Sequence, residues 1–194
     1  LGLRNLTVIQ NTIDMVKENY GIDVEFDQEM SDPKVYKLWQ EGNTSGIFQF
    51  ESQGMTNFMK ELRPDCLEDL IAGVSLYRPG PMDQIPRYIR GKQNPGHNEY
   101  THPSLEPILN VTYGCMVYQE QVMQIVRDLA GYSLGRADLV RRAMGKKKLD
   151  VMAKEREVFI HGQVDENGNI IVPGCVRNGI DEQSANKIFD EMAE

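Results

Sequence analysis

The chain has 194 residues, 40% of them hydrophobic, which is enough for one large or two small domains with a buried core. No apolar stretch approaches the roughly 20 residues that a membrane helix needs, and the N-terminus lacks the basic and apolar regions of a signal peptide. We therefore expect a cytoplasmic protein with no membrane partner. The formal net charge of −8 argues against a protein that binds nucleic acid over its whole surface, because such proteins cluster lysine and arginine.

The two ends of the chain and its cysteines give further expectations about the kind of protein. The chain begins with leucine and stops inside an acidic helical pattern without a glycine, so we expect both ends to be cut from a longer chain. The three cysteines are far apart, and no Cys-x-x-Cys pair or histidine at ligand spacing accompanies them: Cys66, Cys115 and Cys175. We expect three reduced structural thiols and no metal site.

The first third of the chain predicts helices separated by turns. Apolar residues recur at helical spacing over residues 3–19, and Gly21 closes that helix. After an extended stretch, the polar residues before Pro33 predict the start of a second helix, and residues 42–46 form a turn. The alternation of apolar and polar residues over 47–50 indicates a short strand.

The middle of the chain predicts two helices and two irregular segments. One helix runs from about Ser52 to Leu62, and Asp65 begins the next, with Glu68 three residues later as in a capping box. The inward residues of that second helix are then Leu67, Leu70, Ile71 and Val74. Asp65, Glu68 and Asp69 are therefore better explained as a cap and first-turn anions than as metal ligands. Residues 78–81 are irregular because two prolines flank a glycine, and residues 91–103 form a polar loop.

The last third predicts four helices and a hairpin. The helices cover residues 118–129, 134–144 and 149–161, followed by a last helix capped by Asp181. An Asn-Gly pair between β-formers predicts a hairpin near 164–172. The sequence therefore predicts a mainly α chain with a few short strands and without internal repeats.

A basic cluster lies between the second and third of these helices. It has a local charge of +5, from one anion, Asp138, and six cations: Arg136, Arg141, Arg142, Lys146, Lys147 and Lys148. On a helix that ends at Gly145, Val140, Ala143 and Met144 face inward while both central arginines face outward. Such a cluster can hold a polyphosphate or a nucleic-acid backbone, because guanidinium groups match phosphate oxygens. The charge pattern alone nevertheless favours a solvated helix end stabilised by the helix dipole.

Other candidate residues are less specific. The Arg-Pro-Gly-Pro corner could aim Arg78 into a site, although a stiff turn explains it as well. Gln119 and Glu120 open a helix, where the dipole already favours glutamate. Phe48 and Phe50 could stack on a base, but alternating aromatic residues more often pack in a core. The sequence has no Ser/His/Asp order, phosphate-binding glycine loop or helical zinc motif.

Five segments, in this order, resemble the C-family alpha subunits of bacterial DNA polymerase III: Gly46–Ser52, Arg63–Asp69, Tyr77–Pro81, Tyr118–Gln121 and Arg141–Lys148. Each motif is weak alone, but five of them at similar spacing over nearly the whole chain are highly specific. The resemblance implies an irregular multi-helix domain of the fingers type. The residues themselves predict a mainly α chain with a few short strands and the hairpin near 164–172.

The resemblance also implies which part of the enzyme this is. In that family the third of three metal-binding palm aspartates lies in a Phe-Asp-Phe-Leu-Gly-Leu-Arg run, and this chain begins at Leu-Gly-Leu-Arg. Residues 1–10 are then the last stretch of palm, and residues 11–194 are the N-terminal part of the fingers. The catalytic aspartates, and the two Mg²⁺ ions they bind, lie outside the fragment, which we expect to be inactive alone.

The roles implied by the resemblance concern template-directed DNA synthesis. Palm-bound Mg²⁺ activates the primer 3′-hydroxyl, while three cations of the fingers bind the triphosphate of the incoming nucleotide: Arg141, Arg142 and Lys146. A second set lines the cleft or contacts DNA: Arg78, Gln119, Glu120, Lys147 and Lys148. The implied partners are primer–template DNA, deoxynucleoside triphosphates and, through regions outside this fragment, other replicase subunits such as the sliding clamp.

One segment departs from the family pattern, because many members lack the residues 163–177 that carry the hairpin. We expect a dispensable surface decoration there. Two other classes of function remain: a non-catalytic helical nucleic-acid-binding module, and a helical protein-interaction domain whose lysines are solvated. A steep loss of DNA affinity with salt would indicate the first of these, and an absence of DNA affinity the second.

Overall fold

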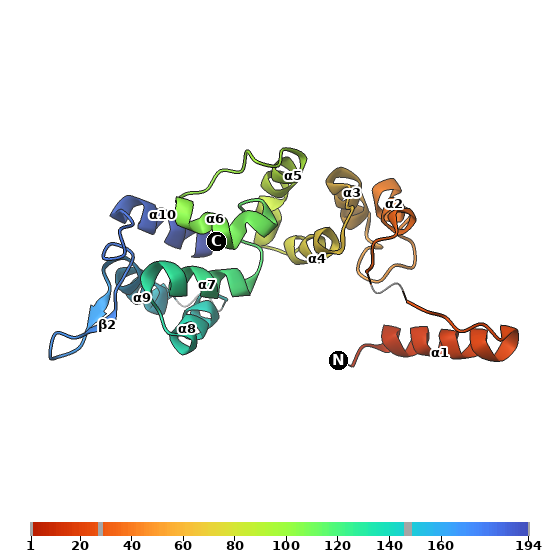
Figure 1. Cartoon of the computed structure of the whole chain (residues 1–194), viewed down its shortest axis with the longest axis horizontal. Helices are drawn as coiled ribbons and strands as arrows, with labels where there is room; N and C mark the ends of the chain where they lie inside the picture. The colour runs from red at the N-terminus through yellow and green to blue at the C-terminus, as the bar shows by residue number, and fades with distance from the viewer. Residues whose placement is uncertain (1, 27–28, 146–148, 194) are drawn as a thin grey trace. The chain divides into compact units, whose positions relative to one another are not determined.

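The computed structural model describes residues 2–26, 29–145 and 149–193. Within these ranges it contains ten α-helices, three short 3₁₀ helices and one two-stranded sheet, which confirms the predicted mainly α fold (Figure 1). None of the helices in these ranges has the length and apolar character needed to cross a membrane. The chain divides into two compact units, Leu1–Val74 and Ser75–Glu194, which are described separately below.

The first unit contains the helices α1 (Arg4–Tyr20), α2 (Pro33–Glu41), α3 (Gln53–Leu62) and most of α4 (Leu67–Leu76). The predicted helix ends are confirmed. Gly21 closes α1 in the left-handed conformation (φ 67°), and the Asp32 carboxylate accepts the Lys34 N–H (2.8 Å) at the start of α2. The Ser52 hydroxyl caps α3 by accepting the Met55 N–H (3.3 Å).

The helix α1 differs from the other helices in its surroundings. Its residues recur at helical spacing, as predicted, but none of them is buried in the described part of the chain. Leu6 and Ile9, on the apolar face, are 54% and 47% exposed. The periodicity therefore predicted the helix correctly, and the residues that would cover its apolar face are not supplied by this unit.

The strand predicted at residues 47–50 is wrong. The Phe50 N–H donates to the Ile47 carbonyl (3.0 Å), which closes a turn, and Gln49 is left-handed with φ 70°. Phe50 is buried and packs edge-on against the ring of Trp39, with 5.6 Å between ring centroids, whereas Phe48 is 46% exposed. The alternation of aromatic residues comes from a turn that buries one ring and exposes the other.

The start of α4 corrects a second prediction. The helix begins at Leu67 rather than at Asp65, and the carboxylate of Asp69 accepts the backbone N–H of Asp65 (3.1 Å). Asp69 lies in the first turn of α4 together with Glu68, as predicted, and its side chain is buried, with 1% exposed. Asp69 stands at the third helical position. Its side chain makes the hydrogen bond back to the start of the helix that was predicted for Glu68.

The buried face of α4 is also shifted from the predicted one. Leu70 is buried as predicted, but Leu67 and Ile71 are 37% and 48% exposed. Gly73 lies on the buried side, and a β-carbon there would come within 2.7 Å of the Met59 side chain. The close contact at Gly73 and the burial of Asp69 therefore determine which face of α4 packs against its neighbours.

The second unit contains most of the remaining elements: η1 (Pro81–Gln84), α5 (Ile85–Gln93), η2 (Pro103–Leu105), α6 (Glu106–Leu109), η3 (Asn110–Thr112), α7 (Gln119–Ala130), α8 (Leu134–Gly145), α9 (Leu149–His161), β1 (Gln163–Val164), β2 (Ile170–Val172) and α10 (Glu182–Ala193). The four helices predicted from residue 118 onwards are confirmed. The helix α5 was not predicted, although Ile85, Tyr88 and Ile89 recur at helical spacing, and Tyr88 is its one buried residue. The polar loop therefore begins at Asn94 rather than at Gly91.

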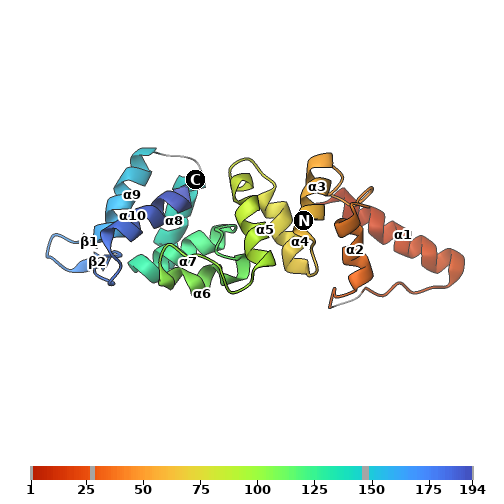
Figure 2. The same cartoon turned by 90° about the horizontal axis from the view of Figure 1, so that it is seen from above.

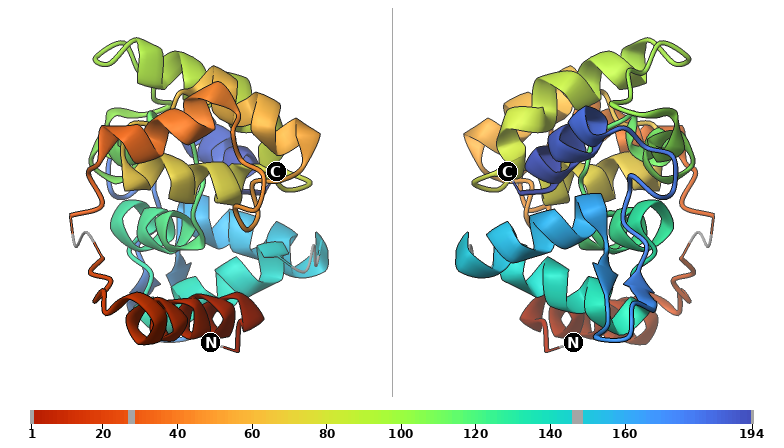
Figure 3. Two further views of the ribbon diagram at one scale, coloured as in Figure 1. Left: turned by 90° about the vertical axis from the view of Figure 1, so that its right-hand side faces the viewer. Right: turned by 90° about the vertical axis from the view of Figure 1, so that its left-hand side faces the viewer.

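The core of this unit lies between its long helices. The helix α9 contacts both α8 and α10, as the right-hand view of Figure 3 shows, and α7 packs against α8. Phe159 of α9 and Phe189 of α10 are fully buried, with 5.6 Å between ring centroids. Val140, Ala143 and Met144 of α8 face inward as predicted.

The hairpin is confirmed, but its predicted role as a surface decoration is wrong for residues 172–175. The strands pair antiparallel, with Gln163 opposite Val172, and the loop projects from the helices of the unit (Figures 1 and 2). Val172 and Cys175, however, belong to the buried core, and the Gly174 N–H donates to the Ala130 carbonyl (2.9 Å). Replacing the whole segment would remove core contacts, so only the projecting loop is expected to be dispensable.

Buried thiols and a helix cap complete the unit. Two cysteines of this unit are buried, and burial raises the pKa of the Cys115 thiol to about 11 and that of Cys175 to about 12. Both are therefore protonated at neutral pH, as expected of structural thiols. The Ser184 N–H donates to the Asp181 carboxylate (2.9 Å), which confirms the predicted cap of α10 and lowers the pKa of Asp181.

Candidate functional site

The larger cavity of the second unit has a volume of about 880 Å³. Three of the segments singled out in the sequence line it: the Pro79–Pro81 corner, Tyr118 and Gln119 at the start of α7, and Arg141 with Gly145 at the end of α8. Further residues come from η1, from α5 and from the end of α10, among them Asp83, Arg87 and Glu191. Segments that are far apart in the sequence therefore meet around one cavity.

A buried glutamine fixes the start of α7 at this cavity. The Gln121 side chain is 5% exposed, and its Oε1 accepts the backbone N–H groups of Val117 and Tyr118 (both 2.9 Å). Its Nε2 donates to the Thr112 hydroxyl (2.8 Å). Because all three bonds are buried or partly buried, they hold Gln119 at a defined place on the cavity wall. Sequence reasoning assigned no role to Gln121, although its place at the third helical position is the signal of a capping box.

Arg141 joins α8 to α7 at the cavity. Its Nε and Nη2 donate to Asp138 Oδ1 (3.0 and 2.7 Å), and its Nη1 donates to Gln119 Oε1. The side chain is 26% exposed. The sequence predicted an outward arginine at this position, and the structure instead brings it against a predicted cleft residue 22 positions earlier.

Arg142 has a different environment. Its side chain is 62% exposed and its Nη2 lies 2.8 Å from Asp138 Oδ2. A hydrogen bond from Arg141 and the positive charges of both arginines lower the pKa of Asp138. One carboxylate therefore partly compensates two guanidinium groups, and the pair retains a net positive charge.

The basic cluster is less concentrated than its sequence indicates. Arg136 lies 3.2 Å from Glu155 of α9, donates to Gln163 of the hairpin and stacks over the ring of Tyr132 at 5.0 Å. Its role is to connect α8 with α9 and the hairpin. Three lysines predicted to bind nucleotide or DNA lie outside the described residues: Lys146, Lys147 and Lys148.

The remaining predicted cleft residues are on the surface. Arg78 and Glu120 are both exposed, and neither is among the described residues that line the larger cavity. Arg78 directly precedes the Pro79–Pro81 corner, and Glu120 directly follows Gln119. The structure therefore brings together Gln119 and Arg141 from the predicted set and leaves Arg78, Glu120 and Arg142 outside this cavity.

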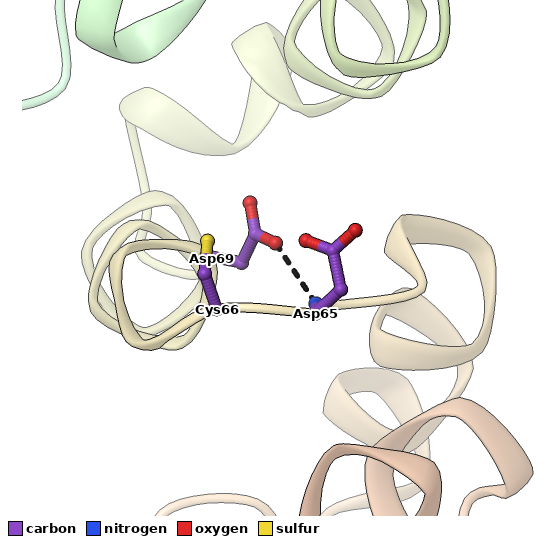
Figure 4. A group of neighbouring side chains, drawn as sticks. All are labelled: Asp65, Cys66 and Asp69. Atoms are coloured by element: carbon purple, nitrogen blue, oxygen red, sulfur yellow. Dashed lines mark hydrogen bonds between the residues drawn. The ribbon is translucent and has the colours of Figure 1, made fainter. Parts of the chain in front are cut away.

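One group of potential metal ligands exists among the described residues, in the first unit. Ligand-type atoms of Asp65, Cys66 and Asp69 lie within 4.8 Å of one another. Figure 4 shows the carboxylate of Asp69 turned toward the backbone of Asp65, where it accepts the N–H. Because this bond stabilises the start of α4, we assign the Asp69 carboxylate a structural role.

The fold is that of a helical domain, as the sequence predicted, and Arg141 lines its larger cavity. The model of the bacterial DNA polymerase III alpha subunit finger domain matches residues 5–167, and the chain therefore belongs to this family. The resemblance stated from the motifs is thus confirmed.

Curated proteins similar to this chain are DNA polymerase III alpha subunits. The chain is 47% identical to DNA polymerase III subunit alpha of Thermus aquaticus over 198 residues, which cover 99% of the chain and 15% of that protein. It is 44% identical over 191 residues to the subunits of Halalkalibacterium halodurans and Staphylococcus aureus, covering 98% of the chain and 16% and 17% of those proteins. The chain thus spans about a sixth of the length of these relatives.

Proposed function

We propose that this chain is part of the catalytic alpha subunit of a bacterial replicative DNA polymerase, a nucleotidyltransferase that copies a DNA template. In this proposal the larger cavity receives the triphosphate of the incoming nucleotide. Family membership supports the first statement. The observation that carries the second is the position of Arg141, on the wall of a cavity that also includes Gln119 and the Pro79–Pro81 corner.

The size and lining of the cavity suit a nucleotide. Small-molecule sites usually have volumes of about 300 to 1,000 Å³, and this cavity has about 880 Å³. The first turn of α7 has backbone N–H groups without partners inside the helix, which favours an anion near Gln119. Asp83 and Glu191 also line the cavity, so the triphosphate is expected on the side of Arg141 and α7.

The arginines of α8 act as the triphosphate-binding cations in this proposal, together with Lys146. A triphosphate competes with Asp138 for the guanidinium groups, and its larger negative charge favours the exchange. Arg142, being exposed, is free to turn toward a ligand at the end of α8. Five residues are proposed to contact primer–template DNA or line the cleft: Arg78, Gln119, Glu120 and, outside the described residues, Lys147 and Lys148.

The rest of the enzyme completes the site. We propose that residues 1–10 end the palm and residues 11–194 belong to the fingers, so that the catalytic aspartates and their Mg²⁺ ions lie outside this chain. The sliding clamp and other replicase subunits bind elsewhere on the full-length protein. The isolated chain is then inactive, and primer extension with Mg²⁺ and four nucleotides tests this. Robust extension by the pure chain would contradict the assignment.

The arginines are tested in the full-length polymerase. Arg141→Ala and Arg142→Ala should each lower kcat/KM for the nucleotide by about ten- to a hundredfold, the value of a charge-assisted hydrogen bond to phosphate. Lysine at either position should restore part of the loss, because it keeps the charge without the planar fork. Single-turnover incorporation at varied nucleotide concentration measures the effect.

A matched control separates nucleotide binding from stability. Arg177 is exposed and lines neither cavity, so Arg177→Ala removes one positive charge from the same unit. Thermal melting of all variants identifies any loss of folding. Incorporation kinetics in both α8 variants equal to those of Arg177→Ala would refute the proposal.

A further inference from the structure

A second depression of about 500 Å³, here called the α5 groove, lies in the second unit. Its walls come from α5, from the polar loop that follows, and from Tyr113. Arg87 and Arg90 contribute the positive charges, and Glu99 contributes the one carboxylate among its lining residues. All of its lining residues except Tyr113 lie within residues 87–99, to which the sequence motifs assigned no function.

The two arginines of the groove are available for a ligand. They stand three positions apart on α5 and therefore share one face of the helix. The Arg87 Nη2 donates to the backbone carbonyl of Glu99 (2.9 Å), which is a neutral acceptor. Within the described ranges, neither guanidinium group lies within ion-pair distance of a carboxylate. Both charges act on the buried Cys115, where they oppose the rise in its pKa caused by burial.

Ion pairing among the described residues divides the nine arginines of this unit into two groups, and Arg87 and Arg90 share the unpaired group with Arg78 and Arg177. The guanidinium groups of five arginines each lie beside a carboxylate: Arg127, Arg136, Arg141, Arg142 and Arg156. The chain has a net charge of −8, yet among the residues that the structure describes no carboxylate lies within ion-pair distance of Arg87 or Arg90. Two uncompensated guanidinium groups at one groove favour the binding of an anion.

The groove is built by close packing rather than by loose surface loops. A β-carbon on Gly91 would lie 2.5 Å from Tyr113 Cβ and 2.8 Å from Asn98 Oδ1, so glycine allows both residues to approach α5. The ring of Tyr113 packs edge-on against Tyr88, with 5.0 Å between centroids, and Tyr88 is 1% exposed. The walls are therefore held in place before any ligand arrives, which lowers the entropic cost of binding.

We propose that the α5 groove binds the backbone of single-stranded nucleic acid, with Arg87 and Arg90 on phosphates and Tyr113 beside a base. Arginine with an aromatic ring is the combination that single-strand sites use. A strand fits better than a free anion, because the groove is open and lined by the amide side chains of Asn94 and Asn98 as well. Arg87 lines both the groove and the larger cavity, so a strand in the groove leads toward the proposed nucleotide site.

The proposal rests on the proposed function only for the identity of the strand, which would be the DNA that the polymerase copies. Arg90 is the residue to change first, because it is exposed and lines the groove but is not among the residues that line the larger cavity. Fluorescence anisotropy of the full-length protein with a labelled oligothymidylate measures binding. Arg90→Ala should weaken it about tenfold at low salt.

Salt dependence gives the proposal a second measurement. Loss of one phosphate contact should reduce the slope of log affinity against log salt by about 0.7, and Arg90→Lys should keep most of that slope. The control variants Arg177→Ala and Lys187→Ala each remove one exposed positive charge that lines neither cavity. Both controls should bind the oligonucleotide as the unchanged protein does.

The outcomes separate this inference from the proposed function. Arg90→Ala should lower oligonucleotide affinity and leave the KM for nucleotide unchanged. Arg141→Ala should impair nucleotide use and leave oligonucleotide affinity unchanged. Oligonucleotide affinity of Arg90→Ala equal to that of the controls would overturn the inference and leave the nucleotide site intact. If Arg90→Ala weakened binding of inorganic pyrophosphate but not of the oligonucleotide, the groove would bind a free anion and the strand assignment would also fail.

Discussion

The two arginine pairs of the second unit differ in the groups that face them. At the end of α8, Arg141 and Arg142 share the Asp138 carboxylate. On α5, Arg87 donates to a backbone carbonyl and Arg90 lies beside it in the same groove. The α8 pair is conspicuous in the sequence because lysines follow it, while the α5 pair is not. The number of cations in a segment is therefore a poor measure of the positive charge that it offers to a ligand.

The difference has consequences for binding. An anion at α8 competes with an existing ion pair, so a strongly charged ligand such as a triphosphate is favoured over a single phosphodiester. An anion in the α5 groove displaces no carboxylate, so even singly charged phosphates can gain from the contact. The two sites are thus suited to different partners, a nucleotide at α8 and a strand on α5.

The largest expected effect concerns Arg136, which has three internal partners. Arg136→Ala removes contacts with Glu155, Gln163 and the ring of Tyr132, and leaves Glu155 partly buried without its ion-pair partner. We expect the free energy of unfolding to fall by about 2 kcal/mol. Urea denaturation measures it. Arg177→Ala should change it by less than about 0.5 kcal/mol, and an equal effect of both variants would show that the pairing of Arg136 is not structural.

The next effect concerns the wall of the α5 groove. Gly91→Ala should lower the free energy of unfolding by about 1 to 2 kcal/mol, because the new β-carbon would overlap Tyr113, including its backbone. Gly135 in α8 is the matched control, since no atom lies within 4 Å of a β-carbon there. Gly135→Ala should raise stability by up to about 1 kcal/mol through helix propensity. Stabilisation by both variants would show that the groove wall is not closely packed.

Oligonucleotide affinity gives a second comparison of Gly91→Ala with Gly135→Ala. A displaced Tyr113 should weaken binding in Gly91→Ala and leave it unchanged in Gly135→Ala. Equal affinities of the two variants would show that the wall does not contribute to the groove's function.

The smallest expected effect concerns Asp138. Its pKa is lower in the folded protein than in the unfolded chain, so its contribution to stability is present above its ordinary pKa of 3.8 and is lost as the pH falls through the lowered value. Asp138→Asn should therefore melt at a slightly lower temperature than the unchanged protein at pH 7, with the difference disappearing at strongly acidic pH. Thermal melting from pH 7 to pH 2 measures this. Glu166→Gln, at an exposed position of the hairpin loop, is the control. A difference that persists at strongly acidic pH would contradict the role of the ion pairs.

Much of the secondary structure follows from the sequence because its signals are local. Apolar spacing predicted the four helices after residue 118, and Asp32, Asp181 and the Asn-Gly pair predicted two helix caps and the hairpin turn. Each signal acts between residues at most a few positions apart, as do the hydrogen bonds that form these elements. Five motifs in the family's order also determined the family, which requires no knowledge of packing.

Tertiary structure decided what the local signals leave open. Phe50 forms a turn because its ring packs on Trp39, and Asp69 is buried because it closes the start of α4. Val172 and Cys175 enter the core through contacts with helices that precede them. The packing of Phe50, Val172 and Cys175 depends on residues of other helices, which periodicity does not specify.

Contacts between residues distant in the sequence also form the larger cavity and the α5 groove. Gln119 meets Arg141 across 22 positions, and Arg90 shares a groove with Tyr113 because Gly91 leaves room for that residue to approach. Residue types and spacing predicted that the α8 arginines bind phosphate, and gave no such prediction for Arg87 and Arg90. Whether a carboxylate already occupies each guanidinium group depends on which helices lie side by side, and only the packed chain determines that.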